Sequence, residues 1–186
     1  LNITCNSNNI IETLSYTLLD STIWVDIPDL IDYINIELFF ENTISLELDI
    51  NTNWNLIGIP LNVSNNYYGF LFPEAIDGTL FGFLDTYYLS DSLIIGSGYW
   101  LKFENSLETE IIGYPMQSIS VDIFEGWNLI SGLDNAINIE SINDSLGIII
   151  PETLFEFNET YNVSQILEPG RGYWLRASNS GIITIH

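Results

Sequence analysis

The sequence predicts a mainly β protein that consists of an N-terminal β segment followed by two homologous, small β-rich units. The first observation is a repeat: WNLIG at residues 54–58 returns as WNLIS at 127–131, and GYWLK at 98–102 returns as GYWLR at 172–176. The second is a period of two, since apolar and polar residues alternate along residues 44–50, as they do in a strand with one buried face.

The repeated positions divide the chain into three segments. Residues 1–45 have no counterpart in the repeat, whereas residues 46–117 and 118–186 form its two copies. Because a module of this length repeats its structure along with its sequence, we expect two similar folds side by side, each sandwich-like or barrel-like. Each copy should contain a strand before the Trp, a strand that begins at it, a loop or short helix, a middle strand, and a final pair of strands around GYWL.

The N-terminal segment is expected to be strand-rich. Residues 34–38 and 44–50 alternate on either side of a polar turn and predict a half-buried hairpin, and 14–18 and 23–27 are earlier strand candidates. A segment this short cannot bury a stable core alone. It should therefore pack on the first repeat, belong to a larger domain, or be exchanged with a neighbouring subunit.

The chain is strongly acidic. It holds 25 Asp and Glu residues against 3 Lys and Arg, which gives a formal net charge of −22. Phosphate backbones and anionic lipid surfaces repel such a polyanion, so we expect neither a nucleic-acid partner nor a membrane-surface partner. No run approaches the ~20 apolar residues of a membrane span, so membrane insertion is not expected either.

Catalytic and metal-binding patterns are weak. His186 is the only histidine and Cys5 the only cysteine, so we expect no Ser/His/Asp triad, no Cys/His pair and no internal disulfide. Residues 49–53 begin like a calcium loop, but Trp54 stands where that loop requires Gly and Pro60 where it requires Glu. We therefore expect no enzymatic activity and no cofactor beyond a weakly bound structural divalent cation such as calcium.

Two of the three bases occupy the same place in the repeat. Lys102 follows Trp100 by two residues and Arg176 follows Trp174 in the same way, so alternation places each base and its Trp on one face of a strand. Such a base can hold a local carboxylate, stack on an aromatic ring, or belong to a ligand-binding face. These four residues are the candidate ligand-binding site, although we favour a structural role for the bases.

The tryptophans themselves have two interpretations. Because large rings repeated at the same positions bury much area, we expect Trp54, Trp127, Trp100 and Trp174 to be core anchors. The alternative is that one matched pair is exposed in a groove, where sugar rings would stack on the indoles.

Two glycine-rich stretches precede the GYWL strands, GSG at 96–98 and GRG at 170–172. A phosphate-binding loop requires a helix after the glycines, whereas here a strand follows. We therefore predict turns or bulges in which a glycine adopts a positive φ.

Five Asn-x-Ser/Thr sequences would accept N-glycans if the chain passed through a glycosylating export route. They begin at Asn2, Asn62, Asn143, Asn158 and Asn162.

The pattern WNLI(G/S) followed further on by PGxGYWL resembles a tandem repeat of secreted and cell-surface proteins of bacteria and archaea. The resemblance covers residues 46–186 and is closest at 168–175, which read EPGRGYWL. The first copy departs from it by lacking the Pro. The resemblance implies an extracellular or cell-surface location and a structural or adhesive role, and it supplies no catalytic motif.

The sequence thus favours a non-catalytic extracellular structural or adhesive module, such as a subunit of a surface layer or filament. Its partners would be further copies of itself, other surface proteins, or glycans. A carbohydrate-binding module that uses exposed Trp or Tyr is the alternative. A hydrolase that uses two carboxylates is a third interpretation, although no pair of acids stands out.

Overall fold

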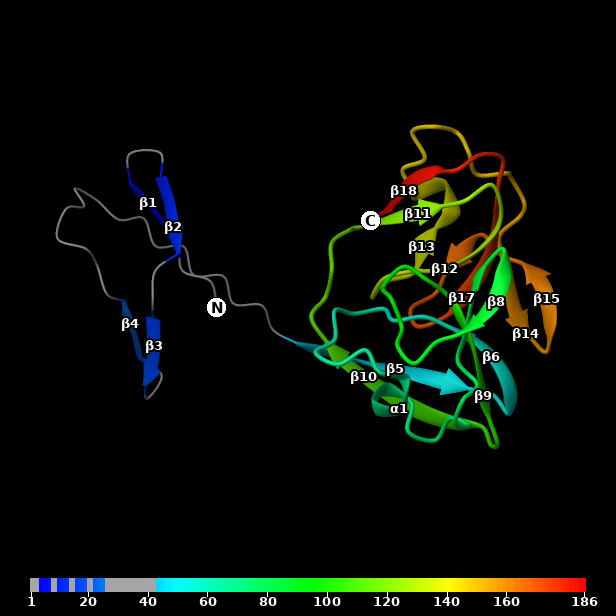
Figure 1. Ribbon diagram of the computed structural model, residues 1–186, viewed down its shortest axis with the longest axis horizontal. Helices are drawn as coiled ribbons and strands as arrows, with labels where there is room; N and C mark the ends of the chain where they lie inside the picture. The colour runs from blue at the N-terminus through cyan, green and yellow to red at the C-terminus, as the bar shows by residue number, and fades with distance from the viewer. Residues whose placement is uncertain (1–3, 8–9, 14–15, 20–21, 26–42) are drawn as a thin grey trace. The chain divides into compact units, whose positions relative to one another are not determined.

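The structure is a computed structural model that describes residues 4–7, 10–13, 16–19, 22–25 and 43–186 (Figure 1). The chain divides into two compact units, Leu1–Asn42 and Thr43–His186. In the first unit β1 pairs with β2 and β3 with β4, both antiparallel. Their bounds are β1 Thr4–Ser7, β2 Ile10–Thr13, β3 Tyr16–Leu19 and β4 Thr22–Val25. The strand predicted at 34–38 lies outside the described residues.

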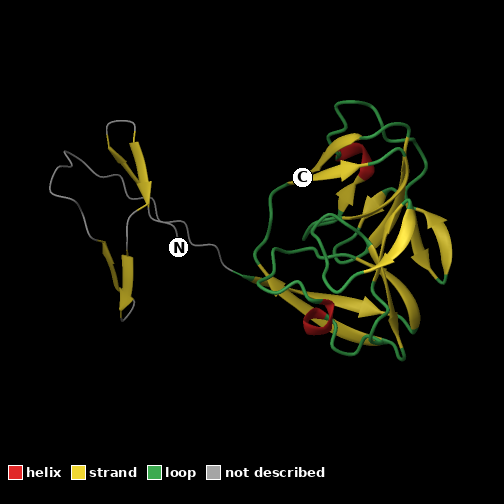
Figure 2. Ribbon diagram, viewed as in Figure 1, coloured by secondary structure: helices red, strands yellow, loops and turns green. Residues whose placement is uncertain are grey.

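The second unit is mainly β, as the sequence predicts, with short helical turns between strands (Figure 2). The first repeat contains β5 Ile44–Ile50, β6 Asn53–Ile57, α1 Tyr68–Leu71, β7 Phe81–Leu84, β8 Thr86–Leu89, β9 Tyr99–Phe103 and β10 Leu107–Gly113. The second contains β11 Ile119–Ile123, β12 Gly126–Ser131, β13 Ile137–Asn138, the 3-10 turn η1 Ile139–Ser141, β14 Phe155–Asn158, β15 Thr160–Val163, β16 Ile166–Leu167, β17 Gly172–Ala177 and β18 Gly181–Ile185.

The two repeats have the same sheet topology. Each builds a four-stranded antiparallel sheet, in the order β6-β9-β7-β8 in the first repeat and β12-β17-β14-β15 in the second. Each also pairs its strand before the Trp with its last strand, as β5 with β10 and β11 with β18. The sequence repeat is therefore a repeat of strand order as well.

Each repeat buries an apolar core of its own. Along β5 the side chains of Leu48 and Ile50 are buried, whereas those of Glu47 and Asp49 are exposed, as the alternation predicts. The first core gathers residues of β5, α1, β9 and β10, and the second gathers the matching residues of β11, β17 and β18. Tyr99 and Tyr173, the largest fully buried side chains, occupy the same position in the two cores.

A buried asparagine fixes the tight turn before each β6-type strand. The Asn55 Oδ1 accepts a hydrogen bond from the backbone N–H of Asn51 at 2.9 Å, and its Nδ2 donates to the carbonyl oxygen of Asn51 at 2.8 Å. Asn128 makes the same pair of bonds with the backbone of Phe124, also at 2.9 and 2.8 Å. Because both asparagines point inward, alternation points the Trp that precedes each of them outward.

The two repeats are interlocked through their backbones. The Gly58 N–H of the first repeat donates to the Gly170 carbonyl of the second at 3.1 Å. In the reciprocal place the Ser131 N–H of the second repeat donates to the Gly96 carbonyl of the first at 2.9 Å. The sequence predicted two folds side by side. The structure adds that each repeat completes backbone hydrogen bonds of the other.

The glycine-rich stretches make this interlock, and the prediction that they are turns is confirmed. Gly96 and Gly170 have φ values of +83° and +73°, a region that disfavours other residues. Gly98 is required for a different reason, since a Cβ atom there would lie 2.7 Å from the Ile130 carbonyl oxygen of the other repeat. Only glycine lets the two backbones approach this closely.

Candidate functional site

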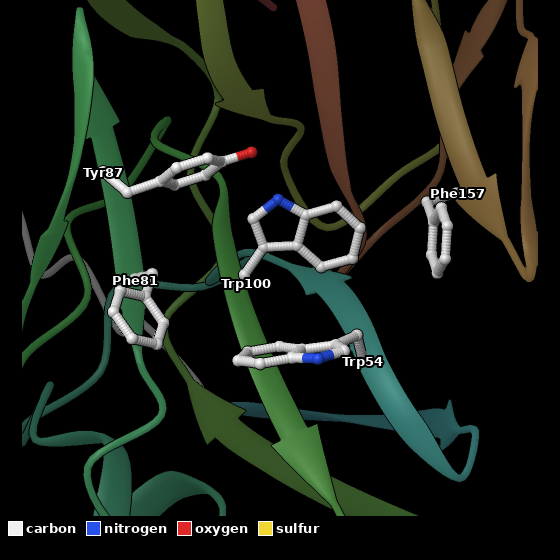
Figure 3. A pocket seen from close by; sticks show the side chains of 5 residues that line it. All are labelled: Trp54, Phe81, Tyr87, Trp100 and Phe157. Carbon is white, nitrogen blue, oxygen red and sulfur yellow. The ribbon is translucent and has the colours of Figure 1, made fainter.

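A cluster of aromatic side chains lies where the two four-stranded sheets meet. In the first repeat it forms the Trp54 cleft, a cavity of about 380 Å³ lined by Trp54, Phe81, Tyr87, Trp100 and Phe157 (Figure 3). Figure 3 shows the Trp100 ring among the others, with Phe157 facing it from the ribbon of the second repeat. The cleft therefore needs both repeats for its walls.

A matching cavity, the Trp127 cleft, lies in the second repeat. It has a volume of about 460 Å³ and is lined by Phe83, Trp127, Phe155, Tyr161 and Trp174. Here Phe83 is the residue supplied by the other repeat, so the exchange of a phenylalanine is reciprocal.

The rings of the Trp54 cleft hold one another in edge-to-face and tilted geometry. The centroids of Trp54 and Trp100 are 6.3 Å apart at 88°, and those of Trp100 and Phe157 are 4.8 Å apart at 75°. The matching pair Trp127 and Trp174 lies at 6.2 Å and 83°. Such pairs contribute about 0.5–1.5 kcal/mol each beyond the area they bury, so both clefts are preformed.

The exposure of the tryptophans corrects the expectation that all of them are core anchors. Trp100 is only 9 % exposed, and Trp174 is half-buried. Trp54 and Trp127, in contrast, are 37 % and 41 % exposed. The physical reason is the inward asparagine that follows each of them, because it turns the preceding side chain toward solvent. In each cleft the less exposed Trp, Trp100 or Trp174, thus forms the floor, and the more exposed one, Trp54 or Trp127, forms a wall open to solvent.

The repeated bases stack on the exposed indoles. The Nζ of Lys102 lies 5.8 Å from the ring centroid of Trp54, and the Cζ of Arg176 lies 5.9 Å from that of Trp127. Each base faces its Trp across a strand pair, since Trp54 pairs with Lys102 and Trp127 with Arg176. Of the alternatives for these bases, the structure shows ring stacking, a cation–π contact.

A polar pocket adjoins the Trp54 cleft and shares Trp54 and Phe157 with it. It has a volume of about 600 Å³. Its lining comprises Asn51, Thr52, Asn53, Trp54, Ser106, Phe157 and Glu159. The Nδ2 of Asn51 donates to the Oδ1 of Asn158 at 3.5 Å, so the turn of the first repeat contacts the β14–β15 hairpin of the second.

This polar pocket was not predicted from the sequence. In the sequence, residues 49–53 stand out only as an incomplete calcium loop, and Glu159 belongs to the other repeat. One signal in the sequence could have indicated the pocket, because this turn differs between the two copies. The first copy has Asn51, Thr52 and Asn53 where the second has Phe124, Glu125 and Gly126.

The predicted site residues are distributed as follows. Trp100 and Trp174 line the two clefts, whereas Lys102 and Arg176 cover the exposed tryptophans from the neighbouring strand. Asn2 lies outside the described residues. The remaining sequon asparagines have exposed side chains, namely Asn62, Asn143, Asn158 and Asn162.

In the part of the chain that the structure describes, no three His, Cys, Asp or Glu side chains gather in an arrangement that could hold a metal ion. Within the same residues, no helix combines the length and the apolar character needed to cross a membrane.

Comparisons with known proteins add no further assignment. The chain matches no protein-family model, and searches of curated proteins and of solved structures find no match either.

Proposed function

We propose that this chain is a non-catalytic, extracellular adhesive module that binds carbohydrate at the Trp54 cleft and the adjoining polar pocket. The observation that carries the proposal is the position of Trp54, whose exposed indole borders both cavities. A sugar ring presents apolar C–H groups on its faces and hydroxyl groups around its rim. It therefore suits a site that places an aromatic face next to amide and hydroxyl side chains.

The preformed geometry also supports binding. Trp54 is held between its partner rings and the Lys102 ammonium group, and Asn55 fixes the turn that carries it. A ligand that meets a rigid site loses less free energy to the ordering of side chains.

The extracellular location rests on the resemblance to secreted repeats and on the exposed sequons. The non-catalytic role is supported by the lining of the polar pocket, whose described residues include one carboxylate, Glu159. A glycoside hydrolase would in general use two carboxylates on either side of the scissile bond. Measurement of reducing-sugar release from any bound polysaccharide would test the hydrolase alternative, and we expect none.

The proposal is tested by glycan-array binding of the intact chain, followed by titration monitored through tryptophan fluorescence. Trp54→Ala should weaken binding at least tenfold, with the β-sheet circular dichroism spectrum retained. Trp127→Ala is the matched control, because it removes an equally exposed Trp from the other repeat. Absence of any glycan binding, or binding that Trp54→Ala leaves unchanged, would overturn the proposal.

Self-association is a second candidate, favoured by the sheet edges. The strands β8 and β15 lie at the ends of their sheets, and every residue in them is exposed. Leu89 and Val163 are 63 % and 58 % exposed, which makes each edge an apolar acceptor for another strand. We propose that β8 of one copy would pair with β15 of the next, giving an open-ended assembly.

This second candidate predicts salt-dependent association, since a charge of −22 repels like copies until it is screened. Sedimentation velocity at 10 mM and 500 mM NaCl should show larger species only at the higher salt concentration. Leu89→Lys should suppress them. A monomer under both conditions, and with added calcium, would exclude the candidate.

A further inference from the structure

We infer that the combined site around Trp54 selects neutral sugars that carry an N-acetyl group, such as N-acetylhexosamine units. This inference rests on the proposed function and specifies its ligand class. The site has two unlike compartments with a common wall: the aromatic Trp54 cleft and the polar pocket, both bordered by Trp54 and Phe157.

The aromatic compartment is the more selective of the two. Its walls are five aromatic side chains. A hydroxyl group gains nothing by entering such a cavity, because it would lose its hydrogen bonds to water. A methyl group, in contrast, is stabilised there by transfer from water. Among the sugar substituents that end in a methyl group, the acetamido group also carries an N–H and a carbonyl.

The polar compartment supplies what the rest of the acetamido group requires. Its N–H needs an acceptor and its carbonyl needs a donor, and a side-chain amide offers both. Asn51 and Asn53 line the polar pocket beside Trp54, and Ser106 adds a hydroxyl group. The sugar ring would lie against the Trp54 face, with its methyl group toward the cleft and its amide toward the asparagines.

Charge argues for a neutral ligand. The chain has a net charge of −22, and Glu159 is itself part of the polar pocket. Uronic or sialic acids would bring a further carboxylate into this field and are disfavoured. Lys102, the base of the Trp54 strand pair, is positioned over the indole.

The Trp127 cleft provides a control within the same molecule. It is also enclosed by five aromatic side chains. Where the first repeat has Asn51 and Asn53 in the turn before the Trp, however, the second has Phe124 and Gly126. That turn offers no side-chain amide, so N-acetyl recognition should be confined to the first repeat, with one site per chain.

The test compares two trisaccharides that share ring type, linkage and length and differ only in the substituent at C2 of each ring. Tri-N-acetylchitotriose carries acetamido groups at C2, and cellotriose carries hydroxyl groups there. Titration of the full chain in 150 mM NaCl should give at least tenfold tighter binding of tri-N-acetylchitotriose, with one site. Loss of one buried methyl group accounts for about a fourfold difference, and the unpaired amides account for the rest.

Three variants complete the design. Asn51→Ala should remove most of the preference for the acetylated sugar while leaving the Trp54 platform in place. Phe124→Asn, a change in the matching turn of the other repeat, should leave the binding of the trisaccharides by the first repeat unchanged. Trp54→Phe keeps an aromatic ring, so it should retain the fold while weakening the binding of both trisaccharides.

The outcomes separate the two proposals. Equal affinity for the two trisaccharides, or a preference for cellotriose, would overturn the inference and leave carbohydrate binding intact. A preference that survives Asn51→Ala unchanged would overturn the placement of the acetamido group. Failure of both trisaccharides, together with a blank glycan array, would overturn the proposed function as well.

Discussion

A Cβ atom placed on Gly58 would lie 2.1 Å from the Cβ of Ser131, its counterpart in the second repeat. The ends of WNLIG and WNLIS therefore face each other across the interlock, and there is room for only one side chain. The Oγ of Ser131 fills this space while lacking a hydrogen-bond partner among the described residues. The difference between the two copies at this position is thus a packing requirement.

This relationship predicts the outcome of exchanging the two residues. Gly58→Ser should lower the free energy of unfolding by about 1–3 kcal/mol or more, because two side chains would then overlap. Adding Ser131→Gly to that variant should restore most of the loss. Urea unfolding of both single variants and the double variant gives the coupling energy. Additive effects with no rescue would contradict the proposed packing.

Ser131→Ala is the control for this pair. It keeps the Cβ and removes a buried hydroxyl group without a partner, so stability should be unchanged or slightly raised. A large loss of stability would show that the hydroxyl group makes a contact that this arrangement does not contain.

The two buried asparagines, Asn55 and Asn128, should contribute equally to the free energy of unfolding. Asn55→Ala and Asn128→Ala should each lower the free energy of unfolding by about 1–3 kcal/mol, because buried backbone groups lose their partners. Asn55→Ala should also weaken glycan binding, since it frees the turn that carries Trp54, whereas Asn128→Ala should not. Thermal unfolding and fluorescence titration together measure both effects. Equal effects on binding would contradict the assignment of the ligand to the first repeat.

The buried tyrosines predict a loss of stability at alkaline pH. Burial raises the pKa of Tyr99 to about 12, and burial likewise raises the pKa of Tyr173 to about 12. Each hydroxyl group accepts a backbone N–H, that of Ile94 at 3.2 Å or that of Glu168 at 2.8 Å. In the unfolded chain these hydroxyl groups would ionise near pH 10. Their contribution is therefore fully present below pH 10 and is lost as the pH rises toward 12.

This pH dependence is checked by urea midpoints measured from pH 8 to 12. Tyr99→Phe and Tyr173→Phe should each reduce the slope above pH 10, at the cost of about 1 kcal/mol at pH 7 from the unpaired N–H. Tyr114→Phe, which changes an exposed tyrosine, should leave the slope as it is in the unmodified chain. An unchanged slope in both core variants would exclude these tyrosines as its source.

The net charge predicts a fold that salt stabilises. With 25 acids and 3 bases, repulsion between carboxylates should lower the thermal midpoint at 10 mM NaCl relative to 150 mM. The effect should level off once the screening length falls below the spacing of surface charges. A midpoint that is independent of salt would mean that the acids are locally neutralised, for example by bound cations.

Much of the fold was predictable because it depends on local patterns. Alternation along 44–50 identified β5 and its buried face, and the glycines at 96–98 and 170–172 identified turns. The repeat located matching strands in both copies. The alternation predicted a hairpin between 34–38 and 44–50, whereas the described residues pair β5 with β10, far along the chain. Strand pairing depends on three-dimensional topology, so this partner of β5 could not be found from a local pattern.

The candidate site was predictable only in part. The repeat drew attention to Trp100 and Trp174, which do line the clefts, and to the bases that follow them. It gave the wrong environment for Trp54 and Trp127, because repetition of a large ring is equally compatible with a core and with a paired surface. It also gave no indication of Phe157 in the Trp54 cleft or Glu159 in the polar pocket, since the other repeat contributes both.

The sequence alone thus determined the β class, the duplication and the positions of the turns, because alternation, repetition and glycine chemistry act over a few neighbouring residues. Only the tertiary structure decided that the copies interlock and exchange a phenylalanine. It also decided which tryptophans remain open to solvent. These features depend on contacts between residues far apart in the chain, such as Trp100 with Phe157, and no local pattern encodes such a contact.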